Sequence, residues 1–488
     1  MSCILPCPSR RTPFPLLLWT SSLALLAPFM AGCSGSGTGP TLSGNTRVVV
    51  LASSTANDQL SAFTTTLQSV TLTNQAGKTV NLLASPVSEE FIHLNGHIEP
   101  IATVSIPQGT YISASATYSG VATPVCNAQG SGSNQTDTLT GGASETINLP
   151  NPITVEGTGM GLVLDLKVIA YPGQCPTPAQ YPSAPPVTAA FDLTPLTLAA
   201  QPTNSTNGLA LGLEGTIGSV GSGAAQFTVN GLVNGQTPPT WQVSLNSSTV
   251  LQGISGAAQL TAQVPVDMDV AIQPDGSLVA TRVSVISTGT TTLTVASGPL
   301  MTVSDAEPVT YVIGAAQQGY LSTGINGFGY VNFGNSQFQA PAQFKNLASL
   351  PFTATFTPVA MVAGQNVTVT TQATSYSSSP SYIPLTTMAL RPQTINGTVS
   401  AISSEGGFTR YTVTLAPYDL FPQFAVQPGQ TTLLTNPNTV VVYVDSNTQM
   451  LNQSSPAVGG IFRFYGLVFN DNGTLRMDCA QINDGVRE

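Results

Sequence analysis

The chain has 488 residues, enough for about three domains with cores of their own. Only 7% of the residues are charged, against roughly 25% in an ordinary soluble domain, so neutral polar groups must coat the surface. The net charge of −10, with 12 basic residues, argues against nucleic acid as a partner, because neutralising phosphates needs clustered Lys and Arg. An apolar fraction of 41% excludes a bundle of membrane helices.

Residues 1–32 are predicted to be a bacterial lipoprotein signal peptide. Arg10 and Arg11 precede an apolar stretch that is short for a spanning helix of about 20 residues. The stretch ends in Ala31-Gly32-Cys33, which resembles a lipobox and implies cleavage before Cys33 and lipidation of that cysteine. An ordinary secretion signal cut elsewhere, or a twin-arginine signal, are the alternatives.

Residues 33–44 are rich in Gly and Ser and are predicted to form a flexible tether. Ser34, directly after the lipid-bearing cysteine, resembles lipoproteins sorted to the outer membrane. The resemblance implies a cell-envelope protein of a Gram-negative bacterium that meets the membrane through its lipid. Removing the leader deletes two arginines and no acids, so the net charge of −10 becomes −12.

Three cysteines follow the tether, in a compartment that permits disulfides. Cys126 and Cys175 lie in the same N-terminal region, and we predict a bond between them. Cys479 is then left over and is predicted to be a buried thiol.

Beyond residue 44, apolar and polar residues alternate without a helical period, which predicts an all-β fold. Hairpin turns are predicted at Asn95-Gly96, Asp275-Gly276 and Asn472-Gly473. We expect a β-sandwich followed by two or three small OB-like antiparallel β-barrels.

The sandwich is placed at 45–190. Its sequence resembles an uncharacterised β-sandwich domain of bacterial envelope lipoproteins. The resemblance rests on a Leu94-Asn95-Gly96 turn, a Pro-x-Gly-Thr-Tyr strand entry ending at Tyr111, and a late strand with an inward Asp165. It implies the fold but no activity.

Two barrels are placed at 209–287 and 393–488 on an internal repeat. Gly215-Thr216-Ile217 matches Gly397-Thr398-Val399, and each unit closes on a glycine turn. The pair resembles the uncharacterised OB-like domain that is repeated in related lipoproteins. We expect the extra residues of the second copy in a loop near 417–428.

A divergent middle barrel is placed at 300–392. Its evidence is the strand pattern of Gly364–Val369 and a last strand at Met388–Leu390. The sequence does not reveal its opening strand.

The two histidines, His93 and His97, have the spacing of a zinc pair on a helix. A hairpin turn at Asn95-Gly96 would instead direct their rings to opposite faces, which favours two separate surface or rim histidines. No serine motif lies beside a histidine or lysine, as nucleophilic catalysis would require. No catalytic residue, metal or cofactor is therefore predicted.

Asp267 and Asp269 alternate along one strand and so share a face. Paired carboxylates suit Ca²⁺, but no calcium-loop spacing accompanies them, and a solvated face that blunts a sheet edge is favoured. Asp165 is predicted to be a buried, hydrogen-bonded structural carboxylate.

Phe328, Tyr330 and Phe333 form a candidate ligand face on which sugars could stack, with barrel-core packing as the favoured alternative. The sequence as a whole favours a non-enzymatic structural, adhesive or ligand-presenting protein. A carbohydrate-binding accessory module is the alternative, and a hydrolase is less favoured. The sequence does not identify a glycan or protein partner.

Overall fold

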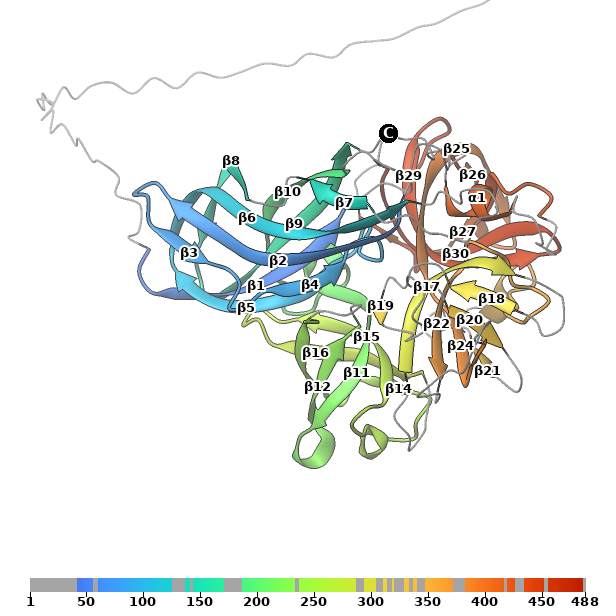
Figure 1. Ribbon diagram of the computed structural model, residues 1–488, viewed down its shortest axis with the longest axis horizontal. Coiled ribbons are helices and arrows are strands. Elements are labelled where there is room, and N and C mark those ends of the chain that lie inside the picture. The colour runs from blue at the N-terminus through green and yellow to red at the C-terminus, as the bar shows by residue number, and fades with distance from the viewer. Residues whose placement is uncertain are drawn as a thin grey trace, which may run out of the picture. The chain divides into compact units, whose positions relative to one another are not determined.

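The computed structural model describes the chain from residue 42 onward, with gaps (Figure 1). The described ranges are 42–55, 60–124, 137–140, 144–170, 187–232, 237–286, 294–303, 310–313, 318–319, 329–332, 337–339, 347–371, 382–416, 419–425, 434–451 and 455–485. The all-β prediction is confirmed: the described residues form four sheets, with a single short α-helix, α1 (Leu420–Ala425). No helix in the described ranges is long and apolar enough to cross a membrane.

The first ten strands form a β-sandwich around one apolar core. One layer has the order β5-β1-β9-β10. In the other layer β2 pairs with β6, β3 and β4 pair with β2, and β8 pairs with β6. β7 pairs with β10 of the first layer and with β6 of the second. The strands are β1 (Asn45–Ser54), β2 (Leu60–Asn74), β3 (Thr79–Asn81), β4 (Val87–Glu90), β5 (Glu99–Pro107), β6 (Gly109–Pro124), β7 (Asp137–Thr140), β8 (Glu145–Val155), β9 (Gly159–Ala170) and β10 (Val187–Leu196).

The two predicted repeats share one barrel topology. The sheet of the first repeat has the order β13-β12-β11-β15-β16 and closes through a parallel β13–β16 pairing. β14 also pairs with β16. Its strands are β11 (Leu209–Val220), β12 (Gln226–Gly231), β13 (Thr240–Ser244), β14 (Val250–Gln252), β15 (Pro265–Ile272) and β16 (Leu278–Val285).

The last sheet repeats this order as β27-β26-β25-β29-β30, closes through β27–β30 and adds β28 on β30. Its strands are β25 (Gln393–Glu405), β26 (Phe408–Thr414), β27 (Thr439–Val444), β28 (Gln449–Met450), β29 (Ile461–Asp471) and β30 (Thr474–Asp484). The opening strands even share a bulge, between Ile217 and Ser219 in one and Val399 and Ala401 in the other. The additional residues of this copy include α1, between β26 and β27, as predicted.

The middle sheet is a third version of the same plan. Its opening strand, hidden in the sequence, is β17, which pairs with β18 and with β22 as β11 pairs with β12 and β15. The sheet also takes β21 in parallel on β24, as β16 takes β14. Its strands are β17 (Thr294–Val303), β18 (Thr310–Ile313), β19 (Gln318–Gly319), β20 (Gly329–Asn332), β21 (Gln337–Gln339), β22 (Asn366–Thr371), β23 (Tyr382–Pro384) and β24 (Thr387–Leu390).

The predicted hairpin turns differ in outcome. Asn472 and Gly473 have φ values of 51° and 86°, as a type I′ turn requires. Gly276 has a φ of 76°, but Asp275 does not share a positive φ, and the turn is longer, closed by a Gln273 N–H to Ser277 O bond of 2.8 Å. The prediction of a hairpin at Asn95-Gly96 is wrong, because the flanking strands do not pair with each other: β4 pairs with β2, and β5 pairs with β1.

The units share apolar cores across their boundaries. Val49 and Leu51, on the outer face of β1, pack into the core of the first barrel. The indole Nε1 of Trp241 donates to Pro100 O at 2.6 Å, which joins that barrel to β5. Leu467 and Phe469 of β29 belong to the core of the middle sheet. Apolar side chains therefore cross the boundaries between neighbouring units.

Candidate functional site

The segment between β4 and β5 lies where the two layers of the sandwich end. It makes two successive turns, closed by Asn95 N–H to Ile92 O at 3.1 Å and by His97 N–H to Leu94 O at 2.9 Å. Gly96, with a φ of 82°, takes a left-handed conformation that glycine adopts at little steric cost. Since β4 and β5 belong to different layers, this segment brings side chains of both layers together.

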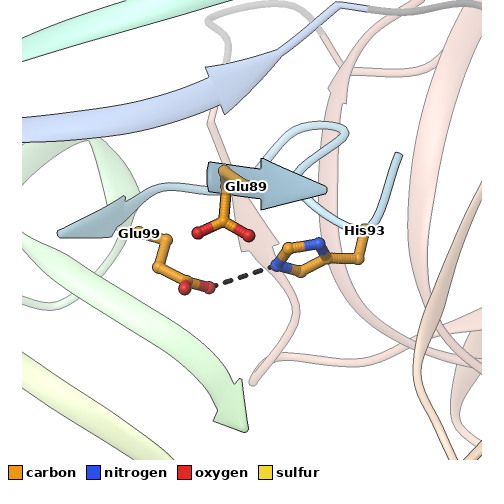
Figure 2. A group of neighbouring side chains, drawn as sticks. All are labelled: Glu89, His93 and Glu99. Atoms are coloured by element: carbon orange, nitrogen blue, oxygen red, sulfur yellow. Dashed lines mark hydrogen bonds and ion pairs between the residues drawn. The ribbon is translucent and has the colours of Figure 1, made fainter. Parts of the chain in front are cut away.

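Four side chains meet there and are called the histidine cluster: Glu89, Glu90, His93 and Glu99. Figure 2 shows Glu89 and Glu99 directed toward the His93 ring. His93 Nε2 lies 3.1 Å from Glu99 Oε2, and His93 Nδ1 lies 3.2 Å from Glu90 Oε2. One ligand atom each of Glu89, His93 and Glu99 lie within 4.8 Å of one another. The carboxylates are buried, and the His93 side chain is 13% exposed.

Glu90 and Glu89 differ in how their oxygens are used. Glu90 Oε1 accepts the N–H of Phe63 at 2.7 Å, and Glu90 Oε2 accepts the N–H of His93 at 2.9 Å. Glu89 Oε1 accepts the N–H of Glu90 at 2.8 Å, whereas Glu89 Oε2 has no hydrogen-bond partner among the described residues. Glu90 therefore orients the His93 ring, whereas one buried oxygen of Glu89 is not hydrogen-bonded to any described residue.

The histidine cluster contains three acidic side chains and only one that can carry a positive charge. Burial alone would lower the pKa of His93, but its hydrogen bonds to Glu90 and Glu99 raise that pKa to about 10. Burial, together with the charge of Glu99, raises the pKa of Glu89 well above its usual range. Three buried carboxyl groups thus surround one imidazole.

The turn itself binds the last barrel. Asn95 Oδ1 accepts Arg463 Nη1 at 2.8 Å, and Asn95 O accepts the Thr394 hydroxyl at 2.7 Å. Gly96 O accepts the Gln481 amide at 2.9 Å. The Leu-Asn-Gly motif seen in the sequence is therefore the contact between the sandwich and the C-terminal barrel.

His97 continues this contact. Its ring is buried, and its centroid lies 3.7 Å from that of Tyr465 in β29. Burial, with the nearby charges of His93 and Arg463, lowers its pKa to about 3, so this imidazole is neutral. The prediction of two separate surface or rim histidines is wrong, because the turn carries both rings into the junction.

A second group of buried charges, called the arginine cluster, comprises Glu214, Asp267, Asp269, Arg282 and Arg391. Arg391 Nη1 lies 2.8 Å from Asp267 Oδ2 and also pairs with Glu214. Arg282 Nε lies 2.8 Å from Asp269 Oδ2, and Arg282 Nη2 pairs with Asp267.

The arginine cluster overturns the prediction for Asp267 and Asp269. The two carboxylates do share a face, since both bind Arg282. Asp267 is only 5% exposed, and β15 lies between β11 and β16 rather than at an edge. The partner that buries Asp267 is Arg391, 124 residues further along the chain.

Two pockets meet at His93. One, of about 590 Å³ including its mouth, is lined by Ile92, Thr394 and Phe421 among others. The other, of about 450 Å³ including its mouth, is lined by Glu99, Arg391 and Tyr465 among others. His93 therefore connects the histidine cluster to space on two sides.

The remaining predicted site residues have separate outcomes. Cys33, Cys126, Cys175, Phe328 and Phe333 lie outside the described residues, and Tyr330 lies in β20 without a described side chain. The lipidation, the disulfide and the ligand face stay predictions.

Asp165 is half-buried and accepts the Thr55 hydroxyl at 2.8 Å, in keeping with a structural role. Cys479 is a buried free thiol, as predicted, and burial raises its pKa.

Sequence reasoning missed Glu89 and Glu99. The available signal was local: two adjacent glutamates precede His93 and a third follows His97, in a chain with only 22 acidic residues. Such a concentration of rare charges around both histidines could have singled out this segment.

No protein-family model matches the chain. A comparison with curated proteins also finds no match. The account of its function therefore rests on the residues described above.

Proposed function

We propose that the chain is a non-catalytic, lipid-anchored protein of the bacterial cell envelope that holds a rigid β scaffold at the outer membrane. The scaffold would serve a structural, adhesive or ligand-presenting role. The resemblance to envelope lipoproteins with a sandwich and OB-like repeats belongs to the same proposal.

The observation that carries the proposal is the buried junction. Asn95 and Gly96 of the sandwich bind Arg463, Thr394 and Gln481 of the last barrel through buried or partly buried polar contacts. Domains joined by small polar interfaces move relative to one another by default, whereas a large hydrophobic interface opposes such motion. Here apolar side chains also cross the boundaries, since Val49 and Leu51 pack into the first barrel and Leu467 and Phe469 into the middle sheet. A presenting scaffold benefits from that rigidity.

The attachment is supported by Ala31-Gly32-Cys33 and by the Gly/Ser-rich tether that follows. A chain poor in Lys and Arg, with neutral polar side chains on its strands, suits a surface exposed outside the cytoplasm and gives no support to nucleic-acid binding.

Cell fractionation tests the proposal. Wild type should sediment with outer membranes, and Cys33→Ala should be released or remain as an uncleaved precursor. Cross-linking on intact cells should then recover neighbouring envelope components only from the anchored wild type. A Cys33→Ala variant that is processed and fractionates like wild type contradicts the anchor, and recovery of wild type in the cytoplasm contradicts the location.

A further inference from the structure

We propose that Glu89, His93 and Glu99 bind a divalent transition-metal ion, for which zinc is the test case, and that this ion cross-links the two layers of the sandwich. The site is independent of the proposed anchoring role. All three residues lie within an eleven-residue stretch of sequence, yet β4 and β5 place the two carboxylates at the ends of opposite layers.

The donor set fits such an ion. One imidazole nitrogen and two carboxylate oxygens are ligands that zinc accepts at about 2.0–2.2 Å. The three candidate atoms lie within 4.8 Å of one another, so small side-chain adjustments bring them around one centre. Calcium fits less well, since it takes six to eight oxygen ligands.

The second observation is the unpartnered oxygen of Glu89. Glu89 is fully buried, and its Oε2 has no hydrogen-bond partner among the described residues. A buried carboxylate oxygen without a partner is costly. Figure 2 shows the Glu89 carboxylate directed toward the His93 ring. A cation at this point would provide the missing partner.

The surroundings supply what a metal-binding histidine needs. Glu90 Oε2 lies 3.2 Å from His93 Nδ1, which fixes the ring and leaves Nε2 facing Glu99. A carboxylate behind a ligating histidine is the usual orienting partner. His93 lines both pockets and Glu99 lines the second, so water in these pockets can reach two of the three ligands.

A bound ion would also affect the junction between the sandwich and the C-terminal barrel. Residues 94–97 contact Arg463, Gln481 and Tyr465 of the last barrel, directly after the ligand His93. An ion bound by β4, the turn and β5 would hold this segment in the conformation that the barrel binds. The metal would thereby stabilise the junction between the sandwich and the C-terminal barrel.

The test is a zinc titration of the detergent-solubilised full-length protein after chelator treatment, followed by calorimetry and metal analysis. Wild type should bind one zinc ion per chain. Glu89→Gln, His93→Gln and Glu99→Gln should each weaken binding by at least tenfold, and Glu90→Gln by roughly 10–100-fold through the orientation of His93.

Two matched controls sharpen the assignment. Glu156→Gln removes an exposed carboxylate of the same domain and should keep the wild-type affinity. His97→Gln removes the neighbouring imidazole but none of the three ligands, so it should still bind one zinc ion per chain. Failure of wild type to bind zinc stoichiometrically overturns the proposal. Unchanged binding in Glu89→Gln, or loss in His97→Gln with retention in His93→Gln, overturns it as well.

A second measurement does not depend on any variant folding. Zinc anomalous scattering from crystals of the wild-type protein should give a peak between Glu89, His93 and Glu99. A peak elsewhere, or none at this site in zinc-soaked crystals, overturns the assignment. Neither result affects the fractionation test of the anchor.

Discussion

The arginine cluster and the histidine cluster both bury acidic side chains, but they differ in the number of cationic groups that accompany them. In the first, two buried carboxylates and the partly exposed Asp269 meet two guanidinium groups. Glu214 also accepts hydrogen bonds from Ser297 at 2.5 Å and Thr368 at 2.7 Å. In the second, three buried carboxyl groups meet one imidazole, and one oxygen of Glu89 has no partner among the described residues. The first cluster carries its own cations, whereas the second has room for one from solution.

The comparison separates two roles for buried charge. Replacing one partner of a complete network leaves the other charges buried without a counter-charge and lowers the free energy of unfolding. A network short of positive charge can instead couple stability to a cation, because anything that binds only the folded state stabilises it.

The largest effect is expected from Arg391→Met. This change leaves Glu214 and Asp267 buried without one of their cations, which should lower the free energy of unfolding by about 3–5 kcal/mol. Urea denaturation followed by circular dichroism measures it. Lys167→Met is the control, because the Lys167–Asp192 pair is exposed and should cost at most about 1 kcal/mol. Equal, small losses in both variants would mean that the arginine cluster does not stabilise the fold.

A smaller effect is expected at Asp478, where burial and the charge of Asp445 raise the pKa to about 7. Between the unfolded and folded pKa values, the native state binds more protons than the unfolded state. Stability should therefore fall as the pH rises from about 4 to about 8. A pKa raised from about 4 to about 7 corresponds to roughly 4 kcal/mol, and solvent screening of this partly exposed group reduces the expected loss to on the order of 2 kcal/mol.

Asp478→Asn should remove that part of the pH dependence. Comparing urea midpoints of wild type and variant across this pH range isolates the contribution. Parallel curves for the two proteins would contradict a raised pKa of Asp478 in the folded protein.

The smallest effect, Gly473→Val, leaves both clusters intact. Gly473 has a φ of 86° in the β29–β30 turn, where a β-branched residue is strained. The variant should lose roughly 1 kcal/mol or more of unfolding free energy. It should still bind zinc like wild type, because the loss is local to the last barrel. Loss of zinc binding in this variant would mean that the histidine cluster depends on the whole barrel rather than on its own residues.

The sequence predicted the strands and the repeats because period-two alternation and glycine turns are local signals. Gly215-Thr216-Ile217 and Gly397-Thr398-Val399 do open barrels of one strand order. The middle copy's opening strand, β17, was hidden because its sequence does not repeat the Gly-Thr-Ile/Val pattern.

The site was harder to predict because it depends on pairing. Asn95-Gly96 has the sequence of a hairpin turn, yet its flanking strands pair with β2 and β1 in different layers. That choice of partners, which no local pattern encodes, brings Glu89 to Glu99 and turns His97 onto Tyr465. The shared face of Asp267 and Asp269 was predictable, but the distant Arg391 that buries Asp267 was not.

The central claim is that the histidine cluster takes its missing charge from a metal ion. Urea unfolding of wild type and Glu89→Gln, each with and without zinc, tests it most directly. With zinc at about 100 times its dissociation constant, wild type should gain roughly 2.7 kcal/mol of unfolding free energy, and Glu89→Gln should gain far less. Glu89→Gln should fold, since the amide has the shape of the acid and Glu89 Oε2 has no hydrogen bond to lose among the described residues. An equal gain in both proteins, or no gain in wild type, would contradict the account.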